Sequence, residues 1–172
     1  MCIRDSGMDY GFTNDPTTLV SSIVDHEKKE IWIYDEHYET GMLTNDIYKM
    51  LEEKELLKAS ITGDNAEGRL IKELIAKGVR RLHKSTKGQG SVRQGILYLQ
   101  GFTIYIHPKC VRTVEEFNTY TFDKDKNGKT LNEPIDANNH IIDALRYSME
   151  RYHLKKNSNV EDKLKAFKSL GL

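Results

Sequence analysis

Cysteine is scarce in this sequence, and its scarcity excludes two kinds of architecture. Only Cys2 and Cys110 occur among 172 residues. Two cysteines so far apart provide neither the disulfide framework of a small secreted domain nor the ligand spacing of a zinc site. The composition therefore suits a reducing compartment.

A charge excess and a long apolar run are also missing. Lys plus Arg and Asp plus Glu both number 26, so the formal net charge is zero and no overall basic footprint indicates nucleic acid. Any contact with DNA must come from a local patch. No apolar run approaches the roughly 18 residues of a membrane span, and no secretory leader is recognisable. We expect no membrane partner.

Enough apolar material is present for one domain, since 38% of the 172 residues are hydrophobic. The opening MCIRDS fits poorly with the strand that begins at residue 7 and resembles a translated sequencing adapter. We therefore interpret residues 1–6 as a non-native leader, 7–153 as the folded domain and 154–172 as a charged C-terminal tail. On this interpretation a natural upstream portion is missing.

The order of predicted elements indicates the fold class. β-Branched and aromatic runs predict three consecutive antiparallel strands at 7–12, 17–25 and 30–39. Later strands are expected at 56–64, 79–85 and 102–108, and helices at 44–54, 66–77, up to about 100, 111–119 and 138–153. A polar hairpin is expected over 120–135. We predict an α/β fold with one mixed central sheet, three antiparallel strands followed by parallel strands, and helices on both faces.

Three aspartates are notable for their positions. Asp9 lies inside the first predicted strand, Asp64 where a later strand ends, and Asp143 on the last long helix. Singly, each is typical of a cap, a turn or a surface position. A carboxylate inside an apolar strand is costly unless it is paired or metal-bound, and strand ends are where α/β folds bind ligands. Hard divalent cations need carboxylates that converge from separate rigid elements, so the set favours a metal site.

The last helix carries a second polar pattern, NNHIIDALRY at 138–147. His140, Asp143 and Tyr147 share one helix face because they are three and seven positions apart. The opposite face is an apolar stripe of Ile141, Ile142, Leu145, Met149 and Tyr152. Two interpretations stay open for the polar face: a solvated surface, or a pair of ligands held on a rigid element.

Six stretches together resemble a known family. They are GMDYGFTNDPT (7–17), YDEHYETGMLTNDI (34–47), GDNAEGRLIKEL (63–74), KGQGSVRQGI (87–96), YIHPKC (105–110) and NEPIDANNHIIDALRY (132–147). In this order, from residue 7 to about 152, the chain resembles the C-terminal nuclease domain of the large terminase subunit of tailed double-stranded DNA phages. One departure is Gly63, where relatives more often have an alanine.

The resemblance implies a ribonuclease H-like fold and an endonuclease that cuts concatemeric double-stranded phage DNA with two divalent cations, Mg²⁺ or Mn²⁺. Asp9, Asp64 and Asp143 correspond to the catalytic, metal-binding carboxylates, with Asp9 as the expected bridge between the ions. His140 falls where that branch of the family has a histidine beside the last aspartate, and we expect it, one helical turn from Asp143, to ligate a metal or to orient the phosphate or water. The implied partners are a portal protein and a terminase small subunit, in the host cytoplasm, together with an upstream ATPase domain absent from this chain.

A basic group lies in the fifth predicted strand, 79–85, and in the segment after it. Its members are Arg80, Arg81, Lys84, Lys87 and Arg93. The neighbouring Gly88, Gly90 and Ser91 would let backbone amides approach phosphates, as sequence-independent DNA binding requires. An ordinary solvated face is the alternative.

Two motif-like segments are misleading. Residues 123–134 imitate a calcium loop, but its twelfth position is Pro134 in place of glutamate. Asn127-Gly128 is instead a favoured hairpin turn. NGKT at 127–130 is not a phosphate-binding loop, because Asp123 stands where that motif begins with glycine.

Two rival functions remain. One is another ribonuclease H-like nuclease of the resolvase or integrase type, against which the NHIIDALRY match speaks. The other is a non-catalytic docking module of the packaging motor, against which the complete set of three aspartates speaks.

Overall fold

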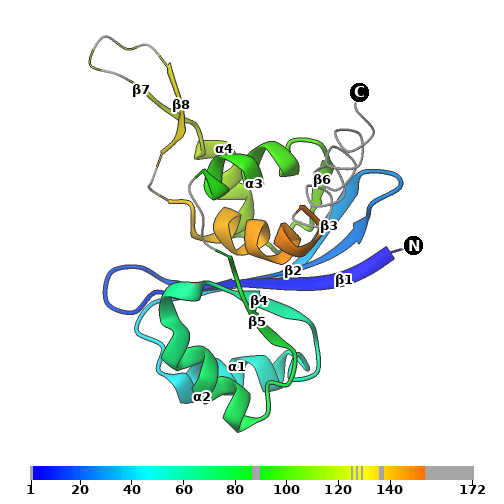
Figure 1. Ribbon diagram of the computed structural model, residues 1–172, viewed down its shortest axis with the longest axis vertical. Helices are drawn as coiled ribbons and strands as arrows, with labels where there is room; N and C mark the ends of the chain where they lie inside the picture. Colours follow the sequence, from blue (N-terminus) through cyan, green and yellow to red (C-terminus); the bar gives the residue numbers. More distant parts are fainter. Residues whose placement is uncertain are drawn as a thin grey trace, which may run out of the picture.

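A mixed six-stranded sheet crosses the middle of the molecule in the strand order β5-β4-β1-β2-β3-β6 (Figure 1). The computed structural model describes residues 2–86, 90–124, 126, 128, 130–135 and 138–153. The strands are β1 (Cys2–Asp9), β2 (Thr17–Asp25), β3 (Glu30–Glu39), β4 (Ile61–Gly63), β5 (Leu82–Lys84) and β6 (Thr103–Ile106). β1, β2 and β3 are antiparallel neighbours, whereas β4, β5 and β6 join in parallel. The predicted mixed sheet is confirmed.

Helices cover both faces of the sheet, as predicted. In the view of Figure 1, α1 (Thr44–Glu53) and α2 (Gly68–Lys77) lie below it, and α3 (Ser91–Leu99), α4 (Val111–Thr119) and the last helix at 140–153 lie above it. A short 3₁₀ helix, η1 (Asn65–Glu67), precedes α2. The predicted polar hairpin is formed by β7 (Phe122–Lys124) and β8 (Thr130–Pro134), which pair antiparallel.

Each face of the sheet has its own hydrophobic core. Met8 and Leu19 pack with Ile47 and Leu74 from α1 and α2 on the lower face. The upper core joins strand residues to the last helix, and includes Val20, Ile31, Ile33, Ile141, Leu145 and Met149. Each fully buried aliphatic side chain stabilises the fold by roughly 1.5–3 kcal/mol. The last helix is therefore held firmly against the sheet.

The polar face of the last helix is not a solvated surface. Arg146 and Tyr147 are buried, and the side chains of His140 and Asp143 are only 20% and 16% exposed. The solvated interpretation of this face is therefore wrong. The helix begins at His140 rather than at 138.

Several strands differ from their predicted bounds, and β5 (Leu82–Lys84) and β6 (Thr103–Ile106) lie inside the predicted 79–85 and 102–108. β4 begins at Ile61 instead of 56, because the preceding apolar pair closes α1. Glu55 adopts φ +58°, and the Leu56 amide donates to the Leu51 carbonyl at 2.8 Å, as in a Schellman C-cap. Leu56 and Leu57 then pack on the lower core, which explains their apolar character.

The first strand was predicted to begin at residue 7 and to run to 12, but β1 spans Cys2–Asp9. Residues 2–6 pair with β2 from Asp25 to Ser21, so excluding them from the fold was wrong. Their interpretation as a non-native leader stays a prediction. The predicted tail at 154–172 and Lys87 lie outside the described residues. Within the part of the chain that the structure describes, no helix has both the length and the apolar character to cross a membrane.

Candidate metal centre

Asp9 and Asp64 are brought side by side by the parallel pairing of β1 with β4. Met8 is the register partner of Gly63, and the Asp64 amide donates to the Met8 carbonyl at 3.0 Å. The two aspartates follow these partners directly on strands about 4.8 Å apart. Register partners share a sheet face, so both carboxylates are placed on the face opposite Met8, which is the face covered by the last helix.

Gly7 allows the last helix to lie directly on β1. A Cβ at Gly7 would lie 1.7 Å from the Ala144 carbonyl oxygen, so only glycine fits at this contact. Alternate β1 residues on this face contact the helix: Asp5 Oδ2 is 2.6 Å from Arg151 Nη2, and Asp9 Oδ2 is 3.0 Å from His140 Nδ1. This close approach brings the helix that carries Asp143 next to Asp9.

Tyr147, on the last helix, is a buried phenol on which the charges of all three aspartates act. Burial raises the pKa of Tyr147, and the negative charges of Asp143, Asp9 and Asp64 raise it further. The same three residues are positioned by the β1–β4 pairing and by the packing of the last helix on β1.

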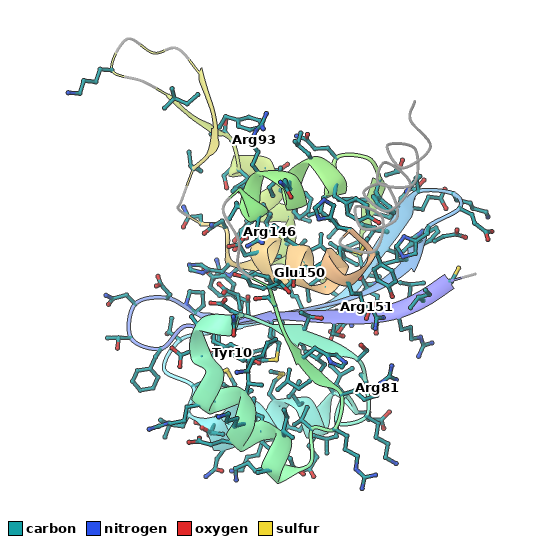
Figure 2. The ribbon with its side chains drawn as sticks, viewed as in Figure 1. Tyr10, Arg81, Arg93, Arg146, Glu150 and Arg151 are labelled. Atoms are coloured by element: carbon teal, nitrogen blue, oxygen red, sulfur yellow. The ribbon has the colours of Figure 1, made fainter. Side chains whose placement is uncertain are left out.

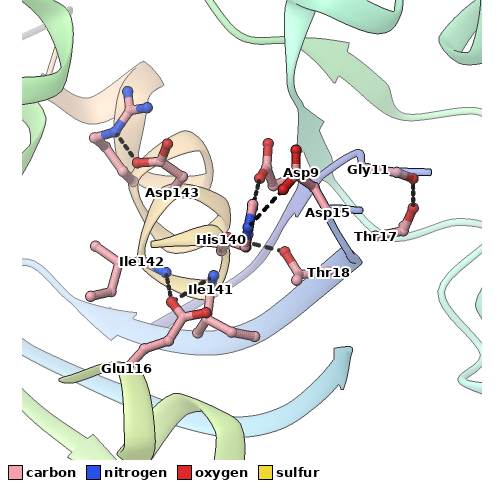
Figure 3. A network of polar contacts seen from close by, with 11 residues as sticks. Asp9, Gly11, Asp15, Thr17, Thr18, Glu116, His140, Ile141, Ile142 and Asp143 are labelled. Carbon is pink, nitrogen blue, oxygen red and sulfur yellow. Dashed lines mark hydrogen bonds and ion pairs between the residues drawn. The ribbon is translucent and has the colours of Figure 1, made fainter. Parts of the chain in front are cut away.

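His140 joins two acidic residues at the N-terminus of the last helix (Figure 3). Its Nδ1 is 3.0 Å from Asp9 Oδ2, and its Nε2 is 3.7 Å from Asp15 Oδ1. The hydrogen bond to Asp9 raises the pKa of His140 despite partial burial, and the charges of Asp9 and Asp15 act in the same direction. Thr18 Oγ1 donates to the His140 carbonyl at 3.0 Å and so ties this residue to β2.

Each predicted metal-binding carboxylate makes its own contact within the chain. Asp64 Oδ1 accepts from the Ala66 amide at 3.3 Å, and Asp143 Oδ1 accepts from Arg146 Nε at 3.1 Å. Among the described residues, no three His, Cys, Asp or Glu side chains form a ready cluster for a metal ion. The donors nevertheless fit a hard divalent cation by their chemistry, because they are carboxylates carried by two adjacent strand ends and by the helix packed on β1. Joint binding of cations by Asp9, Asp64 and Asp143 stays a prediction.

A carboxylate from a different helix caps the last helix. Glu116 on α4 accepts from the amides of Ile141 at 2.9 Å and Ile142 at 3.2 Å, as Figure 3 shows. Burial raises the pKa of Glu116 to about 7, although these two amide hydrogen bonds oppose the shift. Glu116 thus fixes the segment from which His140 and Asp143 project.

Tyr10 occupies the other side of the β1–β4 pair. A Cβ at Gly63 would lie 2.4 Å from the Tyr10 hydroxyl, so this phenol fills the space that an alanine methyl would need. Burial raises the pKa of Tyr10, and the charges of Asp64 and Asp9 raise it further. Gly63 is therefore coupled to Tyr10 by packing.

The predicted basic group is divided by the direction of β5. Lys84 pairs with Gly63 and lies at the strand end next to Asp64. The Arg81 carbonyl accepts a hydrogen bond from the Ile61 amide at the opposite end of the same strand pair, and Arg80 precedes Arg81 in the chain. Figure 2 shows Arg81 in the lower part of the molecule and Arg93, on α3, in the upper part. DNA binding by the predicted group stays a prediction; Lys84 shares the strand end with Asp64, but its side chain lies on the Gly63 face, with Nζ near Gly68 at the start of α2.

Three residues of the site were missed by the sequence reasoning. Arg146 had a detectable signal, since it stands three positions after Asp143 on a helix, where ion pairs form. Asp15 belongs to a turn, and Glu116 to a helix distant in sequence. Nothing in the sequence places either of them beside His140.

The chain matches the profile of the family described as the terminase RNAseH like domain over residues 9–151. It is 30% identical over 154 residues to the PBSX phage terminase large subunit of Bacillus subtilis (strain 168), covering 87% of this chain and 34% of that protein. It is also 30% identical over 148 residues to the large terminase subunit of Bacillus phage SPP1, covering 84% of this chain and 35% of that protein. The chain therefore spans about a third of the length of these relatives.

The structure is similar to that of the nuclease domain of the SPP1 large terminase g2p with bound Mn. The TM-score is 0.81 at 29% identity, covering 86% of this chain and 85% of that one. The P22 large terminase nuclease domain shares the fold, with a TM-score of 0.67 at 19% identity, covering 88% and 81% of the two chains. The predicted ribonuclease H-like fold and family are confirmed. This chain belongs to the terminase RNase H-like domain family.

Proposed function

We propose that this chain is the divalent-metal-dependent endonuclease domain of a phage DNA-packaging terminase large subunit, and that it cuts concatemeric double-stranded DNA. The observation that carries the proposal is the β1–β4 pairing that sets Asp9 beside Asp64, together with the close packing of the helix that carries Asp143 on β1. Family membership and the similarity to the Mn-bound SPP1 nuclease domain support it.

The aspartates would hold two divalent cations, Mg²⁺ or Mn²⁺, with Asp9 as the bridging carboxylate and Asp64 and Asp143 each completing one ion. Such a cation pair, when bound, supplies an activated water and stabilisation of the leaving oxygen in phosphodiester hydrolysis. The Asp9 contact orients the His140 ring at the edge of this cluster. Its Nε2 side, which faces Asp15, is where the imidazole would ligate a cation or hold a water or phosphate oxygen.

The basic residues of the chain fit a DNA substrate that is recognised through its phosphate backbone. Lys84 is exposed at the same end of the strand pair as Asp64, on the opposite sheet face, and a lysine there would pair with a DNA phosphate without reading sequence. Because the relatives are about three times longer, we further propose that an ATPase domain precedes this one. A portal protein and a terminase small subunit would be its partners in the host cytoplasm.

Nicking of supercoiled plasmid by the purified chain tests the proposal. We expect cleavage in Mn²⁺ or Mg²⁺, none in EDTA, and loss of cleavage in Asp143→Asn. Asp25→Asn is the matched control, because Asp25 caps a turn through the amides of Glu27 and Lys28 at the end of β2 distant from Asp9. Thermal melts in EDTA verify that both variants fold.

The result also separates the rival functions. A folded protein that binds DNA but cleaves none in either metal would favour the docking module. Preferential cleavage of branched over linear DNA would favour a resolvase-type nuclease. Wild-type cleavage by folded Asp143→Asn would remove that residue from the mechanism.

A further inference from the structure

We infer that Arg146 is a positioning residue that fixes the Asp143 carboxylate, and that Gly95 on α3 is a glycine because it makes room for the Arg146 side chain. The inference rests on the proposed function of Asp143 as a metal ligand. It concerns residues to which the sequence assigned no role.

The ion pair of Arg146 with Asp143 differs from an ordinary helix-surface pair. Arg146 Nε lies 3.1 Å from Asp143 Oδ1, and the two side chains are 8% and 16% exposed. The pair between Arg112 and Glu115 on α4 is also three positions apart, but its side chains are 58% and 55% exposed. A buried guanidinium is stable only where its partners are fixed, whereas an exposed pair contributes little.

Gly95 shows that α3 is shaped around this arginine. An ideal Cβ at Gly95 would lie 2.5 Å from both Cγ and Cδ of Arg146. Glycine is an unfavourable residue inside a helix, and Gly95 is a buried position within α3. The aliphatic part of the Arg146 side chain occupies the space beside Gly95, which explains why a glycine stands at this helical position.

Tyr147 supports the guanidinium from another side. The Arg146 guanidinium carbon lies 4.5 Å from the centre of the Tyr147 ring. Contacts with α3, with this ring and with Asp143 together fix the direction of Nε. Figure 2 shows Arg146 on the last helix, on the side toward α3. A carboxylate accepts through two oxygens, so Nε and a cation can share Asp143 while Nε sets the carboxylate plane.

The packing half of the inference is tested on metal-free protein. Gly95→Ala should lower the melting temperature in the wild-type background. With Arg146→Ala, the same change should raise the melting temperature by roughly 2–4 °C, because the better helix former then has space. Gly68→Ala is the control, since its Cβ would meet only the flexible end of Lys84, at 3.1 Å. An equal effect of Gly95→Ala in both backgrounds would overturn the steric link.

The positioning half is tested by Mn²⁺ calorimetry and by plasmid-cleavage kinetics. Arg146→Met keeps an unbranched apolar stem but has no donor. It should lower Mn²⁺ affinity or kcat by about 10- to 100-fold, as losing the partner of a metal ligand does, with KM for DNA unchanged. Arg146→Lys should recover part of the loss, and Arg112→Met should behave as wild type.

Three outcomes would overturn the inference. Tighter Mn²⁺ binding by Arg146→Met would make Arg146 a competitor of the cation. A raised KM with a weaker salt dependence would make it a contact to DNA phosphate. Unchanged affinity and kcat would leave it without a role at the site. If the wild type neither binds Mn²⁺ nor cleaves, the proposed function fails, and the metal-free melts still decide the packing of Arg146 against Gly95.

Discussion

Replacing Gly7 by alanine should push the last helix, which carries His140 and Asp143, away from β1, which carries Asp9. The added Cβ would lie 1.7 Å from the Ala144 carbonyl oxygen, whereas real Cβ contacts essentially never fall below 3.0 Å. Closing that gap requires the last helix to retreat by about 1.3 Å, or β1 to bend by as much. The obstacle is backbone, so no side-chain rotation can relieve it.

The retreat should reduce both stability and cleavage. Overpacking of this kind costs roughly 1–3 kcal/mol, which lowers the melting temperature of a chain of this size by roughly 2–12 °C. A displacement of about 1 Å between groups that act together can reduce the rate about 100-fold. We therefore expect Gly7→Ala to lose most cleavage under conditions where it is still folded.

Melts in EDTA and plasmid nicking in Mn²⁺ measure the two effects separately. Gly68→Ala, in which the added Cβ meets only a flexible lysine end, should be close to wild type in both assays. Wild-type stability together with wild-type cleavage in Gly7→Ala would refute the placement of the last helix directly on β1.

Three further predictions concern a ligand, a cap and a DNA contact. His140→Ala should keep the fold and reduce cleavage, with partial recovery in Mn²⁺, which accepts other ligands more readily than Mg²⁺; equal rates for variant and wild type would contradict this. Burial raises the pKa of Glu116 from 4.5 to about 7, so the folded state holds this proton more tightly and wild-type stability should fall by about 3 kcal/mol as pH rises across that interval. Urea unfolding should show this loss in the wild type and not in Glu116→Gln, and equal pH slopes would contradict the assignment. Lys84→Glu should weaken DNA binding and reduce the dependence of DNA affinity on salt concentration, whereas Arg81→Glu, at the other end of the strand pair, should change affinity and salt dependence less. A larger effect of Arg81→Glu than of Lys84→Glu would place the DNA elsewhere.

The sheet and the order of elements were predictable because their signals are local. The β-branched and aromatic runs of β2 and β3 and the polar residues that favour the β7–β8 hairpin each depend on a few neighbouring residues. The position of Asp64 at a strand end was predictable for the same reason, and a strand end in an α/β sheet is itself informative.

Contacts between distant segments were not predictable from these signals. That Gly7 faces Ala144 depends on how a helix packs on a strand more than a hundred residues away. Lys84 and Arg81 look like one basic patch in sequence, yet the direction of β5 places them at opposite strand ends. Leu56 looked like the start of a strand because a helix cap that covers a core is as apolar as a strand.

The central claim is that Asp9, Asp64 and Asp143 together hold divalent cations. Anomalous diffraction from crystals of this chain grown in saturating Mn²⁺ tests it most directly. We predict two Mn²⁺ peaks, with oxygens of all three carboxylates as ligands and Asp9 touching both ions. Crystals in which the three carboxylates keep their present partners and no Mn²⁺ lies among them would contradict the claim.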